Sequence, residues 1–134
     1  MLIINRSQKH GIVLNRRNLL IKDVKEHLAE YRPDLFQIYP KPYLLWAIND
    51  SIDIASSFNI DDVYSMRLFV RLRWDIAPGF YKQAQIEKVL NQTTRTAEDR
   101  FNELATDNFA EAWEEAQKFN NPREWRTRFW EMET

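Results

Sequence analysis

The stretch from residue 54 to residue 90, IASSFNIDDVYSMRLFVRLRWDIAPGFYKQAQIEKVL, predicts two packed helices joined by a turn. Asp61 or Asp62 can start the first helix, because a carboxylate at that position accepts hydrogen bonds from exposed backbone amides. Pro78-Gly79 ends this helix, and a short helix follows over about residues 83–91. The residues expected in the interior are Val63, Met66, Phe69, Val70, Trp74, Ile86, Val89 and Leu90.

The flanking sequence continues the helical pattern on both sides. A helix over about residues 17–31 ends before Pro33, and the next begins near Pro42, a residue suited to a first helical turn. Thr96 can cap a further helix, and Asp107 restarts the chain. A last helix is predicted after Asn121, with Trp125, Phe129 and Met132 on it. The prediction is an all-α fold: a compact bundle of about six to seven short helices.

The first fourteen residues depart from this pattern. Leu2-Ile3-Ile4 and Ile12-Val13-Leu14 are two β-prone runs separated by polar residues and Gly11. They predict an extended or hairpin-like N-terminal arm over residues 1–14, followed by a helical body over residues 15–134. The arm could pair with the sheet edge of a partner or pack on the chain's own helices.

Composition bounds the class of protein. A chain of 134 residues predicts a single domain, and the lack of cysteine excludes disulfides and thiolate metal ligands. No apolar run reaches the roughly 20 residues that span a bilayer, and the start is too short for a signal peptide. A net charge of −1 does not favour nucleic acid. We expect a cytoplasmic protein with neither a nucleic-acid nor a membrane partner.

Polar clusters that could carry chemistry are weak. Asp23, His27 and Glu30 share a helical face and could contribute metal ligands, but one helix does not make a site. Asp50 and Asp53 lie one turn apart, without a nucleophile or a base partner in view. The sequence therefore predicts no catalytic, cofactor-binding or metal-binding residue.

Arginine and tryptophan give the candidate protein contacts. Arg67 and Arg71 form a row on one helix that could bind an acidic partner or pair with the chain's own acidic C-terminal half. The C-terminal run WRTRFW is rich in the residues that dominate interfaces, although it could equally seal the core. The candidate partner-binding residues are Arg67, Arg71, Arg73, Trp125, Arg128 and Trp130.

Three motifs between residues 43 and 105 resemble small helical proteins encoded beside type VI secretion spike and toxin genes. The motif Ala55-x-x-Phe58-Asn59-Ile60 matches a helix-ending A-x-x-[FYH]-G-I turn, with Asn59 in place of glycine. Ala77-Pro78-Gly79-Phe80 matches a G-P-x-F turn with the order of glycine and proline reversed. Glu98-Asp99-Arg100 and Leu104 match an E-x-R-x-x-x-L helix start.

This resemblance implies a non-enzymatic accessory protein that binds a toxin or a component of the secretion spike. The expected role is an adaptor or chaperone for a type VI secretion toxin. The alternative is an immunity protein that binds and blocks its cognate toxin, and a remote alternative is a small helical enzyme or RNA-binding protein. The family offers no catalytic residue to carry over, and the resemblance implies no cofactor.

Overall fold

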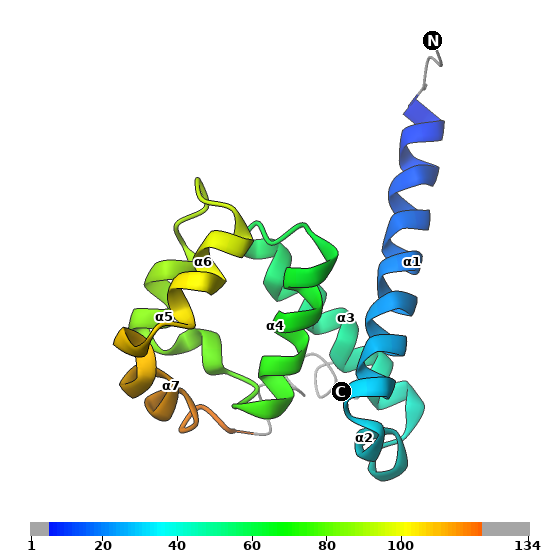
Figure 1. The fold of residues 1–134 in the computed structure, drawn as a ribbon. Helices are drawn as coiled ribbons and strands as arrows, with labels where there is room; N and C mark the ends of the chain where they lie inside the picture. Colours follow the sequence, from blue (N-terminus) through cyan, green and yellow to red (C-terminus); the bar gives the residue numbers. More distant parts are fainter. Residues whose placement is uncertain (1–5, 122–134) are drawn as a thin grey trace, which may run out of the picture. The chain divides into compact units, whose positions relative to one another are not determined.

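The computed structural model describes residues 6–121, and the side chains from residue 16 onward. Over that range it contains seven α-helices, two short 3-10 helices and no strand, which confirms the all-α prediction (Figure 1). The chain divides into two compact units, Met1–Ile48 and Asn49–Thr134, with the boundary inside α3 (Lys41–Ser57). The single-domain organisation stays a prediction.

Unit 1 contains α1 (Arg6–Tyr31), α2 (Pro33–Ile38) and the beginning of α3. Pro33 does more than end α1, since it occupies the first turn of α2, where its missing N–H would have no helical acceptor. The sequence analysis did not predict α2. Among the described side chains of unit 1, from residue 16 onward, the buried apolar residues are Val24, Leu28, Leu35, Leu44, Ala47 and Ile48.

The helix α1 begins at Arg6, eleven residues earlier than the predicted start. Ile12-Val13-Leu14 therefore lies in a helix, and the prediction of an extended arm is wrong for residues 6–14. The β preference of Ile and Val is weak without a partner strand, whereas each residue added to an existing helix gains a backbone hydrogen bond. Leu2-Ile3-Ile4 lies outside the described residues.

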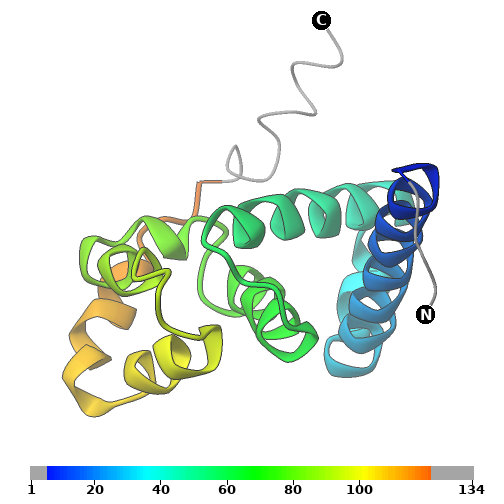
Figure 2. The same ribbon diagram turned by 90° about the horizontal axis from the view of Figure 1, so that it is seen from above.

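Unit 2 contains the end of α3 and a series of short helices that surround a common interior (Figure 1, Figure 2). After α3 come α4 (Val63–Asp75), η1 (Phe80–Lys82), α5 (Ala84–Leu90), α6 (Ala97–Leu104), η2 (Asp107–Phe109) and α7 (Ala110–Ala116). Two predicted caps are confirmed: Asp62 accepts a hydrogen bond from the amide of Ser65 and Thr96 accepts one from Asp99, at 2.9 and 3.1 Å. The predicted helix after Asn121 lies outside the described residues.

Aromatic rings fill the interior of unit 2. The Phe69 ring lies 5.1 Å from that of Phe80 and 6.3 Å from that of Phe58, measured between centroids. Trp113 stacks on Phe80 at 5.8 Å, and its indole N–H donates to the Leu104 carbonyl at 2.7 Å. The stack links α4, η1 and α7, so the short helices share one core.

Candidate functional site

The turn that ends α3 has a backbone conformation that only some residues accept. Asn59 has a φ of 57°, the left-handed region in which glycine or asparagine is favoured. The amide of Ile60 donates to the Ala55 carbonyl at 3.1 Å and that of Asn59 to Ser56 at 2.9 Å, the two bonds of a Schellman helix end. Asn59 thus adopts the left-handed conformation that glycine most often provides at a helix end.

Arg100 of α6 binds the backbone at that turn. Its side chain is buried, and its Nη1 donates to the carbonyl oxygens of Phe58 at 2.7 Å and Leu90 at 2.6 Å. Weaker bonds run from Nη2 to the Asn59 carbonyl at 3.3 Å and from Nε to Thr96 at 3.4 Å. One guanidinium therefore joins the end of α3, the end of α5 and the start of α6.

Backbone carbonyls, not a carboxylate, are the hydrogen-bond partners of Arg100. The last carbonyls of a helix lack partners within the helix and carry the negative end of its dipole, so they suit a cation. Burial lowers the pKa of the Arg100 guanidinium, Arg95 lowers it further, and Asp61 and Asp62 raise it. The group stays charged at neutral pH, because a guanidinium is not deprotonated in proteins.

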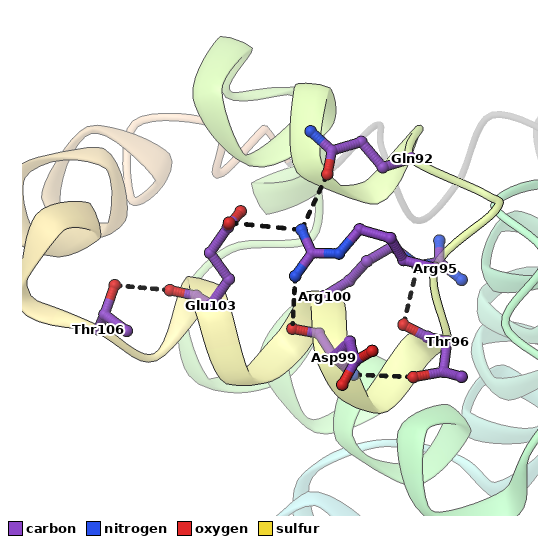
Figure 3. A network of polar contacts seen from close by, with 7 residues as sticks. All are labelled: Gln92, Arg95, Thr96, Asp99, Arg100, Glu103 and Thr106. Atoms are coloured by element: carbon purple, nitrogen blue, oxygen red, sulfur yellow. Dashed lines mark hydrogen bonds and ion pairs between the residues drawn. The ribbon is translucent and has the colours of Figure 1, made fainter.

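A second arginine holds the outer side of α6 (Figure 3). Arg95 Nη1 donates to the Gln92 side chain at 2.8 Å and lies 3.4 Å from the Glu103 carboxylate. Its Nη2 donates to the Asp99 carbonyl at 3.3 Å. Because Arg95 fastens the α5–α6 loop and Arg100 fastens the inner side, α6 is held on two sides.

Arg73 is another buried cation of unit 2. Its Nη1 donates to Ser51 Oγ at 2.8 Å and to Asp50 Oδ2 at 3.2 Å, and its Nε donates to the Pro78 carbonyl at 2.8 Å. The guanidinium carbon also lies 5.7 Å from the centre of the Tyr81 ring. Arg73 therefore joins α3 to α4 and to the Pro78-Gly79 turn, and its guanidinium is not exposed for a partner.

The surface beside the Arg100 site is hollowed. A depression of about 440 Å³ lies between the start of α4 and α6. Its lining residues are Asp62, Tyr64, Ser65, Leu68, Glu98, Phe101 and Asn102. Tyr64 is 76% exposed, and the guanidinium carbon of Arg67 lies 5.5 Å from the centre of its ring. This is a place on unit 2 where apolar, aromatic and acidic side chains border one concave surface.

The other residues singled out in the sequence are dispersed. Arg67 and Arg71 are partly buried on α4, whereas Trp125, Arg128 and Trp130 lie outside the described residues. Asp50, which the sequence pairs with Asp53, accepts a hydrogen bond from Arg73. The side chains from residue 16 to residue 121 include no group of three or more His, Asp or Glu placed to hold a metal ion.

Two residues of this region were not predicted from the sequence to have a functional or structural role. Arg100 was named only as part of a motif, and Tyr64 was not named. Arg100 could not be recognised as buried, because its acceptors Phe58 and Asn59 lie 42 and 41 positions away in the chain. Tyr64 could have been noticed as an aromatic residue outside the apolar stripe of its helix.

Two of the motifs that carry the family resemblance meet in space. Arg100 of the E-x-R-x-x-x-L match binds the carbonyls of Phe58 and Asn59, which belong to the A-x-x-[FYH]-G-I match.

Scans against protein-family models, curated proteins and solved structures each found no match for this chain. Within residues 6–121, no helix combines the length and the apolar character needed to cross a membrane.

Proposed function

We propose that this chain is a non-enzymatic, protein-binding accessory module, an adaptor or chaperone for a type VI secretion toxin. The observation that carries the protein-binding part is the depression between α4 and α6, with the exposed ring of Tyr64 at its edge. Exposed aromatic residues beside a concave surface are typical anchors of protein interfaces. The secretion context comes from the sequence resemblance alone.

Rigidity of the supporting elements favours this role. The start of α4 is fixed by the Asp62 cap, and α6 is fixed by the bonds of Arg100 and Arg95. A surface that is already ordered loses little conformational entropy when a partner binds. The region that carries the resemblance would thus be a scaffold, and the partner would bind to the surface above it.

Co-expression of the full chain with the toxin and the spike protein encoded beside it tests the proposal. An adaptor should co-purify with both proteins and leave the toxin active in a growth assay. Growth protection would favour an immunity protein, and failure to co-purify with either protein would contradict the proposal. A Tyr64→Ala variant should lose capture while it keeps the helical circular dichroism of the parent.

The arginine row of α4 supplies a second variant. Arg67→Glu combined with Arg71→Glu should reduce capture of an acidic partner, because it reverses two charges on one helix face. An unchanged helical spectrum together with lost capture would assign these arginines to the interface. Loss of the helical spectrum would instead show that they hold the fold.

A further inference from the structure

The charge of the depression between α4 and α6 specifies what could fill it. Two of its lining residues, Asp62 and Glu98, are carboxylates, and none is lysine or arginine. Asp61 and Asp99 adjoin them in the chain and are exposed. No hydrogen bond or ion pair engages the Glu98 side chain within the part of the chain that the structure describes.

Leu68 and Phe101 supply the apolar part of the lining, and Ser65 and Asn102 add neutral polar groups. Leu68 is partly buried and Phe101 is 7% exposed, whereas Tyr64 is largely exposed. Apolar side chains with a few well-placed polar groups are the usual composition of a ligand-binding pocket. A volume of about 440 Å³ leaves room for an aliphatic residue and a long basic residue together.

We propose that this depression is the docking site for a basic, apolar segment of the partner protein, in which a leucine-like residue lies next to arginine or lysine. The apolar residue covers Leu68 and Phe101, while the cation lies beside the Glu98 carboxylate. The two carboxylates repel phosphate groups, so they disfavour nucleic acid and anionic lipid headgroups at this depression. The inference rests on the proposed protein-binding function and names the chemistry of one segment of the partner, distinct from any acidic surface that faces Arg67 and Arg71.

Peptide titration of the full-length protein tests the charge requirement directly. The probes are acetyl-Leu-Arg amide and acetyl-Leu-citrulline amide, which have the same shape and differ in charge. The amide resonances of Tyr64, Leu68 and Phe101 should shift when the arginine peptide is added. The dissociation constant of the arginine peptide should be at least tenfold lower than that of the citrulline peptide. Equal binding of both peptides, binding of neither, or shifts confined to other elements would overturn the proposal.

Two charge-reversal variants at matched positions separate the site from general electrostatics. The variants are Glu98→Lys and Glu111→Lys. Glu98 is in the first turn of α6 and lines the depression, whereas Glu111 is in the first turn of α7 and does not line the depression. Both change the net charge by two units and remove an acid from a helix start. Glu98→Lys should weaken the arginine peptide at least tenfold, and Glu111→Lys should leave it unchanged. Equal effects of the two variants would contradict the site.

The partner-capture assay distinguishes failure of this inference from failure of the proposed function. If the toxin or spike protein co-purifies equally well with Glu98→Lys and with the parent chain, the docking site is wrong and the function stands. If neither protein is captured but the arginine peptide binds at Tyr64 and Leu68, the site stands and the proposed function fails.

Discussion

Arg73 and Arg100, both buried in unit 2, are stabilised in different ways. Arg73 has a carboxylate, Asp50, together with a hydroxyl, a carbonyl and the face of an aromatic ring. Arg100 has carbonyl oxygens alone as hydrogen-bond acceptors, two of them strong, at the ends of α3 and α5. The comparison teaches that helix ends can replace a counter-ion when several converge on one guanidinium.

This difference has a consequence for what each arginine holds together. The acceptors of Arg73 include side chains, so their removal is a local change. The acceptors of Arg100 are main-chain carbonyls, which come within reach of the guanidinium only where the helix ends are correctly placed. Arg100 therefore depends on the tertiary fold, and the fold in turn depends on Arg100.

The largest expected effect is that of Arg100→Met. This change leaves the buried carbonyls of Phe58 and Leu90 without a donor and should lower the free energy of unfolding by about 3–5 kcal/mol. Chemical denaturation followed by circular dichroism measures it. Arg95→Met is the control, since Arg95 is partly exposed and should cost less than about 1 kcal/mol. Equal losses in the two variants would mean that burial of the carbonyl bonds is unimportant.

Asp50→Asn tests how much the Asp50 carboxylate contributes to the stability of the protein as the counter-ion of Arg73. We expect a loss of about 2 kcal/mol, because the buried guanidinium then loses the negative charge of Asp50; the figure is below the range for a fully buried pair, since Asp50 retains some exposure. The same denaturation experiment gives the value. A loss near zero would break the comparison, since Arg73 would then resemble Arg100 in needing carbonyl and hydroxyl oxygens alone.

Trp113→Phe extends the comparison to a neutral donor at a helix end. The indole N–H of Trp113 donates to Leu104, the last residue of α6, so the change removes one hydrogen bond and keeps most of the ring packing. The expected loss is about 1 kcal/mol. A loss as large as that of Arg100→Met would show that charge adds little to this kind of contact.

The smallest effect concerns the partly exposed ion pair between Arg32 and Asp34 in unit 1. The hydrogen bond from Arg32 lowers the pKa of Asp34 below its ordinary value of 3.8. A lowered carboxyl pKa gives a stabilising contribution that is present above pH 3.8 and lost as the pH falls through the folded-state pKa. Carboxyl-carbon NMR titration should show Arg32→Gln raising the Asp34 pKa toward 3.8, with melting temperature at pH 7 almost unchanged. A titration curve identical to that of the parent would contradict the role of Arg32.

Local sequence was sufficient for most of the helices of unit 2. Asp62 and Thr96 cap α4 and α6 as predicted, because a cap needs only a side-chain oxygen and the next turn of backbone. The prediction failed where neighbours in the chain mislead. Pro33 indicated the end of one helix but also starts another, and Ile12-Val13-Leu14 has a strand-like composition within a helix.

The candidate site could be predicted only in part, because the roles of its side chains depend on distant residues. Arg67, Arg71 and Arg73 were all candidates for binding a partner, but Arg73 proved to be a buried internal contact. Tyr64 and Glu98 come from helices that are separated in the sequence, and the depression between them exists only once α4 and α6 are packed.

The sequence by itself determined the all-α class, the Thr96 cap and a cap at Asp61 or Asp62, since these depend on propensities and hydrogen bonds within a few residues. Only the tertiary structure decided that Arg73 and Arg100 are internal. An arginine is ordinarily exposed, and nothing in the neighbours of Arg100 shows that a helix end about forty residues away will supply acceptors. The same holds for Arg73, whose side-chain acceptors Asp50 and Ser51 lie 23 and 22 positions away. Burial of a charge is a property of the assembled fold.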